Sequence, residues 1–218
     1  MDKTFIPDSQ LVLNADGSVY HLKLFPEQIA DALLLVGDPN RVKKISAYFD
    51  TIEHKVSNRE LITHTGFYKG KRITVLSTGM GTDNIDIVIN ELDALVNIDL
   101  KTRTIKKEHT RLKLIRLGTS GALQPEIPVG DSFVASRFAL GLADSEMNHK
   151  IESFEFEGLK ITNFEMESSA LYGLSNMLGH DALTICVIIA NRVTEKFAGD
   201  YQIHMDKLIK NTLDRLAD

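Results

Sequence analysis

The stretch that decides the fold covers residues 114–131 and reads LIRLGTSGALQPEIPVGD. Its first four residues form a short apolar run typical of a buried strand, yet Arg116 lies inside that run. A guanidinium beside an apolar core costs free energy unless an anion or several hydrogen bonds meet it. The next four residues, Gly118-Thr119-Ser120-Gly121, predict a loop of exposed backbone N–H groups at the end of a strand, where open α/β sheets bind ligands. Arg116 therefore either meets a bound anion, most simply phosphate, or turns to solvent beside an ordinary glycine turn.

Length and composition narrow the class of protein. The 218 residues are enough for one large α/β domain with a sizeable core, and the net charge of -5 predicts no nucleic-acid partner. A single cysteine, Cys186, excludes a disulfide within the chain, and we expect it to be a small buried hydrophobe. The sequence has no apolar run long enough to cross a membrane and no signal-peptide core, so we expect a cytoplasmic protein without a membrane partner. The spacing of the seven histidines suggests no metal site.

The remaining periodicity alternates between strand and helix. A short buried strand at 33–36 runs into Gly37-Asp38-Pro39-Asn40-Arg41, and we expect a helix to begin near Val42. That turn either holds an anion on its backbone amides or is a plain turn. Strands are also expected at 61–68 and 72–77, joined as a hairpin around residues 69–71, and at 132–136 and 184–190. Helices are expected at 84–96, around 170–178 with Met177 on the apolar face and Gly179 at its end, and at 200–216. This alternation predicts a sandwiched, partly parallel sheet.

Four blocks of the chain, taken together and in order, resemble the type I nucleoside phosphorylase family, most closely its uridine phosphorylase branch. The resemblance extends from about Tyr20 to the C-terminal helix. It implies one α/β domain over residues 1–218, built as a three-layer α/β/α sandwich on a mixed, partly parallel central sheet. The blocks are Gly37-Asp38-Pro39-Asn40-Arg41, Arg116-Leu117-Gly118-Thr119-Ser120-Gly121, Asn163-Phe164-Glu165-Met166-Glu167-Ser168 and Ile189-Ala190-Asn191-Arg192.

The resemblance implies a reaction in which phosphate attacks the anomeric carbon of a nucleoside and displaces the base. The transition state is similar to an oxocarbenium ion, so the protein must align an anion, clamp the sugar and stabilise the leaving base. No protein nucleophile and no cofactor is implied, since inorganic phosphate is the co-substrate. By resemblance, the phosphate site comprises Gly37, Arg41, Arg59, Arg116 and Thr119.

The ribose site implied by the resemblance comprises His21, Glu165, Met166 and Glu167. Arg59 and His21 resemble residues that reach a neighbouring subunit, which implies at least a dimer. Glu165 and Glu167 can face one side only if their segment is extended; otherwise they are acids that favour a helix N-terminus. A monovalent cation near Glu60 is implied by family likeness alone.

Arg192 is the residue that bears on the base. Purine-cleaving relatives carry an aspartate after this strand, whereas here Arg192 takes the end of that loop and no acid precedes it within residues 188–191. An arginine suits the carbonyl oxygens of a departing pyrimidine anion. Arg116, Arg192 and Glu167 are therefore the predicted catalytic residues, and uridine is the favoured substrate.

One departure from the family pattern leaves alternatives open. A family stretch that reads uracil is missing between Leu142 and Ala143, as a real deletion or as residues absent from the sequence. Besides the phosphorylase, two other functions remain: a nucleosidase that uses water, and a catalytically silent nucleoside-binding homologue. Three candidate phosphate arginines argue against the nucleosidase.

Overall fold

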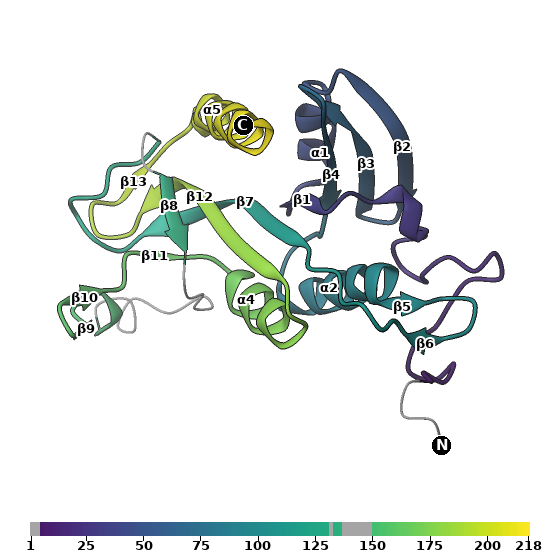
Figure 1. Cartoon of the computed structure of the whole chain (residues 1–218). Helices are drawn as coiled ribbons and strands as arrows, with labels where there is room; N and C mark the ends of the chain where they lie inside the picture. Colours follow the sequence, from purple (N-terminus) through teal and green to yellow (C-terminus); the bar gives the residue numbers. More distant parts are fainter. Residues whose placement is uncertain (1–4, 131–132, 137–149) are drawn as a thin grey trace. The chain divides into compact units, whose positions relative to one another are not determined.

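The computed structural model describes residues 5–130, 133–136 and 150–218 (Figure 1). Its contacts divide the chain into two compact units, which we describe separately. The first unit runs to Ile115 and takes in Ala170–Ala182; the second holds Arg116–Ser169 and Leu183–Leu216. The gap predicted between Leu142 and Ala143 lies outside the described residues and stays a prediction. No helix in the described ranges is long and apolar enough to span a bilayer.

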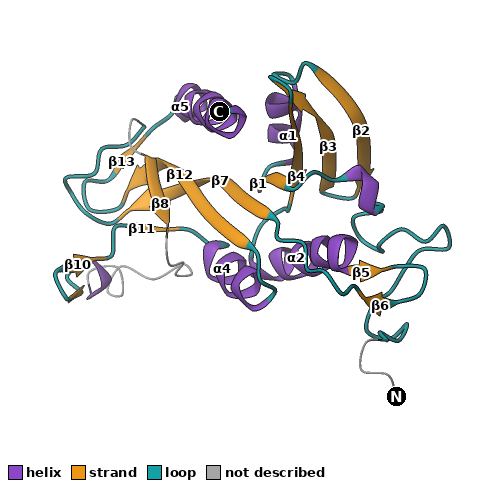
Figure 2. Cartoon of the chain, in the orientation of Figure 1, coloured by secondary structure: helices purple, strands orange, loops and turns teal. Residues whose placement is uncertain are grey.

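Figure 2 shows helices and strands along the whole described chain. The helices are η1 (Pro26–Gln28), α1 (Pro39–Ser46), α2 (Thr82–Asn97), α4 (Ser168–Met177) and α5 (Tyr201–Ala217). The strands are β1 (Ala32–Val36), β2 (Thr51–Asn58), β3 (Leu61–Tyr68), β4 (Lys71–Ser77), β5 (Ile98–Asp99), β6 (Thr104–Ile105), β7 (Lys113–Ala122), β8 (Phe133–Ser136), β9 (Glu155–Phe156), β10 (Leu159–Lys160), β11 (Asn163–Phe164), β12 (Asp181–Asn191) and β13 (Lys196–Phe197).

The central sheet is mixed, as predicted. Its strand order is β13-β12-β7-β1-β4-β3-β2, with β11 on β7 and β8 on β12. β1 and β4 run parallel, whereas β3 is antiparallel to both β4 and β2. The predicted hairpin between β3 and β4 is confirmed, with Gly70 at a φ of 77° in its turn. Glycine adopts a positive φ without steric cost, which explains why the tight turn forms at this position.

Helices cover both faces of the sheet in the first unit. The buried cluster that contains α2 also contains Leu33 and Leu35 of β1 and Leu76 of β4. Side chains alternate along a strand, so the equally buried Leu34 and Val36 point to the opposite face. α1 packs against β1, β3 and β4. Within this unit the sheet therefore lies between two helical layers.

Helix α1 begins three residues earlier than the predicted start near Val42. Asp38 accepts a hydrogen bond from the Asn40 backbone N–H at 2.9 Å and caps the helix, and Pro39 occupies the first turn. Proline lacks the N–H that a first-turn residue would leave unpaired, so Asp38-Pro39 starts a helix here. The turn that follows β1 is therefore only Gly37 and Asp38.

The prediction of a loop at Gly118-Thr119-Ser120-Gly121 is wrong, because all four residues belong to β7. Gly121 is paired with Phe164 of β11, so backbone groups of this stretch serve the sheet. Glycine in a strand interior often marks a place where other groups must come close. Gly118 is such a place, because an added Cβ there would overlap the Arg116 side chain.

The apolar face predicted for the helix that became α4 is correct only in part. Leu171 is fully buried, but Met177 is 81% exposed. The helix ends at Met177, and Gly179 follows it with a φ of 75°, as the predicted stop requires. Met177 lies in the last turn, where the chain turns away from the helix axis and the periodicity no longer holds.

Candidate active site

The second unit contains a buried ion-pair cluster around Arg116 of β7. Arg116 is 4% exposed, and its Nη1 lies 3.1 Å from Glu165 Oε2. Its Nη2 pairs with Glu167 Oε2. The side chains of both glutamates are also buried, at 1% and 7% exposure. Of the two readings of Arg116, the solvent-exposed one is wrong: carboxylates from this chain meet the guanidinium.

The third sequence block reaches Arg116 because β11 is attached to the end of β7. Phe164 lies opposite Gly121 in an antiparallel pairing, and the Ser120 hydroxyl donates to the Phe164 carbonyl. Residues 165–167 are not helical, since α4 begins at Ser168. Two carboxylates that are two residues apart can therefore both turn to one guanidinium.

Glu165 also holds the start of α4. Its carboxylate accepts from the backbone N–H of Glu167 at 3.1 Å and from that of Ser168 at 2.9 Å. These donors have no partner inside a helix, and a carboxylate there also favours the helix dipole. The prediction that Glu165 and Glu167 face one side only in an extended segment is therefore wrong in its premise, because both reach Arg116 from a non-helical bend, and Glu165 also caps the helix, as the alternative interpretation has it.

Gly118 provides the space in which the Arg116 side chain lies. A Cβ at Gly118 would overlap Arg116 Nη1 and would approach Arg116 Cζ and Cys186 Sγ to 3.0 Å each. Cys186 on β12 is itself fully buried, with its Sγ 3.8 Å from Arg116 Nη1. The cluster is therefore closed on the strand side by a glycine and a thiol.

We expect Cys186 to be inert in the native protein. Burial raises the pKa of its thiol to about 12, although the nearby Arg116 guanidinium acts in the opposite direction. Thiol reagents attack the thiolate, which is scarce far below the pKa. At pH 8 a disulfide reagent such as Ellman's should leave the native chain unmodified and should titrate one thiol per chain in guanidinium chloride. Stoichiometric reaction of the native protein within minutes would contradict this.

Arg192 follows β12 and lies over the other glycine of β7. Its Nε would be 3.5 Å from a Cβ at Gly121. Asn191 shapes this turn: its Oδ1 accepts from the backbone N–H groups of Val193 and Thr194, both at 3.0 Å. The Asn191 amide donates in return to the Gln124 carbonyl at 2.8 Å. Arg192 itself is exposed, so its guanidinium is available to a ligand in the second unit.

Three predicted phosphate residues belong to the first unit. Gly37 follows β1 and lies close to the glycine turn at Gly79. A Cβ added at Gly37 would lie 3.2 Å from the Gly79 carbonyl oxygen. Arg41 is 8% exposed and stands in the first turn of α1. Arg59 is exposed in the β2–β3 turn with a φ of 55°, a conformation that is uncommon outside glycine. Arg116 and Thr119 belong to the second unit, so the convergence of all five on one anion stays a prediction.

Glu60 and Met166 are the remaining predicted residues outside the ion-pair cluster. Glu60 is exposed, and its carboxylate lies 3.5 Å from Asn84 Nδ2. One carboxylate alone would need further ligands to hold a monovalent cation, so that cation stays a prediction. Met166 is 45% exposed and stands between the two buried glutamates in the sequence, and its contact with the ribose stays a prediction.

His21 is held by an acid that the sequence reading missed. Its Nδ1 lies 2.7 Å from Glu91 Oε1, and its own backbone N–H donates to the same carboxylate at 2.9 Å. Glu91 lies on α2 and is 8% exposed. The sequence did contain a signal for this contact: Glu91 lies on the same helix face as the apolar Val88 and Leu95. An acid on a buried face needs a partner.

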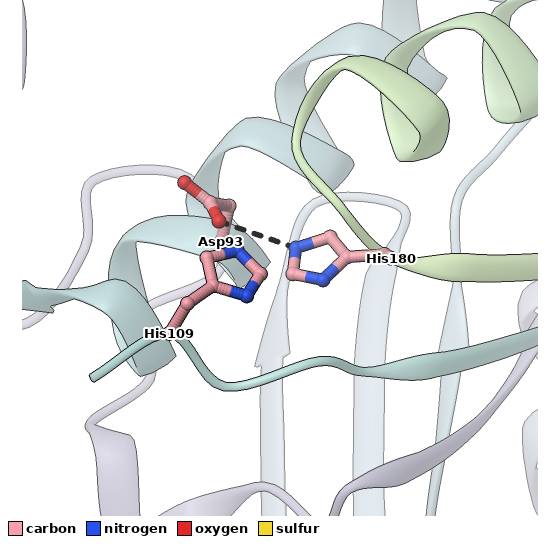
Figure 3. Close-up of side chains that lie close together, drawn as sticks. All are labelled: Asp93, His109 and His180. Carbon is pink, nitrogen blue, oxygen red and sulfur yellow. Dashed lines mark ion pairs between the residues drawn. The ribbon is translucent and has the colours of Figure 1, made fainter.

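A second group that the sequence reading missed joins Asp93, His109 and His180, whose ligand atoms lie within 4.8 Å of one another (Figure 3). His180 Nε2 is 3.2 Å from Asp93 Oδ1, outside hydrogen-bond geometry. The Leu112 backbone N–H donates to His180 Nδ1 at 3.2 Å. That bond assigns the ring proton to Nε2, so Nε2 lacks the lone pair that a metal needs. We interpret the group as a packing contact of α2, the segment before β7 that carries His109, and the link from α4 to β12.

Comparison with known proteins identifies the family. Residues 31–157 match the model of the Phosphorylase superfamily. A uridine phosphorylase of Thermococcus kodakarensis is 31% identical over 237 aligned positions, which cover 84% of this chain and 80% of the relative. A DeoD-type purine nucleoside phosphorylase of Oceanobacillus iheyensis is 30% identical, and the alignment covers 90% of this chain and 98% of that relative. The first alignment exceeds the 218 residues of this chain, so the relative has residues where this chain has none.

Solved structures agree with this result. A Trypanosoma brucei nucleoside phosphorylase that shows uridine phosphorylase activity superposes with a TM-score of 0.79 at 26% identity, over 94% of this chain and 99% of that one. A Phytophthora capsici uridine phosphorylase shares the fold, with a TM-score of 0.74 at 18% identity. The predicted resemblance and the predicted enzyme class, a pentosyltransferase, are thus confirmed at the level of the family. The chain belongs to the phosphorylase superfamily, among the nucleoside phosphorylases.

Proposed function

We propose that the chain catalyses the phosphorolysis of a pyrimidine nucleoside, converting uridine and phosphate to uracil and ribose 1-phosphate. The observation that carries the proposal is the buried cluster of Arg116, Glu165 and Glu167. It joins one guanidinium to two carboxylates, which leaves an excess of negative charge if all three are ionised. That excess suits a ribose that becomes positive in the transition state.

Within this proposal, each group has a chemical task. Glu167 accepts from the ribose hydroxyls, while Arg116 keeps its buried Nε–H, which has no partner among the described residues, for an oxygen of the reacting phosphate. Gly37, Arg41, Arg59 and Thr119 supply further donors to the phosphate. Arg59 and His21 act across a subunit boundary in a homo-oligomer, where Arg59 reaches the phosphate and His21 reaches the 5′-hydroxyl of the ribose.

Arg192 gives the proposal its pyrimidine preference. A departing uracil anion carries charge on two carbonyl oxygens, which a guanidinium can neutralise, whereas a departing purine is best protonated by an acid. The segment 188–192 contains no acid. Relatives of both substrate classes are close to 30% identical to this chain, so the argument depends on Arg192 and not on identity.

A direct assay tests the proposed function. The purified chain is incubated with uridine, inosine or adenosine, with and without phosphate, and ribose 1-phosphate is measured. Uridine cleavage that requires phosphate supports the proposal. Ribose released without phosphate would indicate a nucleosidase, and nucleoside binding without turnover would indicate a silent homologue.

Replacing Arg192 by alanine should lower kcat/KM for uridine roughly a hundredfold, the usual effect of removing one donor to a developing anion. The matched control is Arg215→Ala, which removes an exposed arginine of α5. That control should leave the rate unchanged. Uridine cleavage at the wild-type rate by Arg192→Ala would rule out the role of Arg192 at the base.

A further inference from the structure

Glu91 is a buried acid whose described contacts all go to one short segment of the chain. Its Oε2 accepts from the Leu22 backbone N–H at 2.8 Å, and its Oε1 accepts from the His21 backbone N–H at 2.9 Å. The same Oε1 lies 2.7 Å from His21 Nδ1. The side chain of Glu91 is only 10% exposed. A carboxylate is rarely buried without such a set of donors, so its position depends on this segment.

The segment is held from a second direction as well. Asn58 at the end of β2 donates from Nδ2 to the His21 carbonyl at 2.8 Å. The rings of Tyr20 and His21 meet edge to face, with 4.9 Å between centroids. Backbone and ring of His21 are therefore both fixed, and a fixed ring has little rotamer freedom left to lose when it binds a ligand.

The contact with Glu91 also decides which ring nitrogen carries the proton. A carboxylate can only accept, so the nitrogen that faces it, Nδ1, is the N–H. In the neutral ring the opposite nitrogen, Nε2, then carries the lone pair. The His21 side chain is 33% exposed and lines a cavity of about 480 Å³ in the first unit, next to Tyr20 and Asn90. The outer edge of the ring can thus be reached by a solute.

We propose that Glu91 is a positioning residue: it holds His21 in the Nδ1–H tautomer, so that Nε2 accepts a hydrogen bond from a hydroxyl group of the substrate. The proposal rests on the proposed function, in which that hydroxyl is the 5′-hydroxyl of a nucleoside bound by another copy of the chain. Glu91 touches no substrate and acts only through the imidazole.

The test uses Glu91→Gln, because glutamine keeps the shape and removes the exclusive acceptor. Its amide can turn an N–H toward Nδ1, which would move the ring proton to Nε2 and abolish the acceptor. The first measurement is ¹⁵N-edited NMR of the imidazoles in the full chain, with His21→Gln to assign the signal. The wild type should show Nδ1–H, and Glu91→Gln should show a changed tautomer. An unchanged Nδ1–H signal in the folded variant would overturn the proposal.

The second measurement compares uridine with 5′-deoxyuridine, which lacks the hydroxyl. Losing a hydrogen bond to an oriented group should lower kcat/KM of Glu91→Gln for uridine by on the order of tenfold. The value for 5′-deoxyuridine should change less than about twofold, since that substrate never makes the bond. An equal loss on both substrates would mean that Glu91 has only a structural role, and would contradict the proposal.

The control variant is Asp206→Asn, which removes one exposed acid from α5, away from the cavity that His21 lines. It should leave both the tautomer and the substrate ratio at wild-type values. If the wild type cleaves neither nucleoside, the proposed function fails, and the tautomer measurement still tests whether Glu91 sets the state of His21. The two failures are therefore distinguishable.

Discussion

Replacing Arg116 by methionine is expected to lower the free energy of unfolding by about 3–5 kcal/mol, the cost of leaving a buried charge without its partner. Glu165 and Glu167 would keep their buried carboxylates but lose the guanidinium that lies between them. Methionine retains much of the apolar stem, so the loss reports on charge more than on packing. Urea denaturation followed by circular dichroism measures the change.

Two further variants decide whether buried charge is the cause. Adding Glu165→Gln and Glu167→Gln to Arg116→Met removes the uncompensated carboxylates and should recover at least half of the lost stability. Arg111→Met breaks the exposed contact with Asp181, where the two side chains are 64% and 55% exposed. Exposed pairs contribute about 0–1 kcal/mol, so this control should stay close to wild type. A wild-type unfolding free energy for Arg116→Met would refute the buried cluster.

The same variant should have no measurable phosphorolysis of uridine. Arg116→Met lacks the proposed donor to the phosphate. It also removes the partner that holds Glu167 in the position where it is proposed to contact the ribose. Because the two losses occur in one cluster, their effects on the rate will not add independently. The triple variant separates them: it should regain stability without regaining activity.

Much of the fold could be predicted because it follows from local patterns. The runs at 61–68 and 72–77 alternate around a Lys69-Gly70 turn, and that hairpin formed as expected. The strand at 184–190 is a continuous apolar run that became β12, longer by a few residues at its start and one at its end. The apolar pattern within each of these elements indicates a strand by itself, so distant parts of the chain are not needed to predict it.

The errors arose at residues whose role depends on tertiary contacts. Gly118 looks like part of a turn because glycine favours turns, but its reason is the side chain of Arg116, two residues before it on the same strand. Glu91 was missed for a related reason: its partner His21 lies 70 residues away in the sequence. Spacing rules detect neighbours along the chain and cannot detect contacts that only the sheet creates.

Gly118→Ala is expected to disable the site by adding one methyl group. The new Cβ would overlap Arg116 Nη1 and lie 3.0 Å from Cys186 Sγ, so the guanidinium must move away from its carboxylates. Overpacking of this kind costs about 1–3 kcal/mol, which a thermal-shift measurement detects. A displacement of about 1 Å can lower a rate a hundredfold, so kcat/KM for uridine should fall by roughly that factor.

The matched control is Gly173→Ala in the middle of α4, where an added Cβ meets no atom within 4 Å. Alanine is a better helix former than glycine, so this variant should be more stable by up to about 1 kcal/mol at unchanged activity. The pair makes the same chemical change, from glycine to alanine, at one position that needs space and one that does not. Equal behaviour of the two variants would show that Arg116 does not need the space at Gly118, and would refute the argument that β7 carries a glycine at this position because of the site.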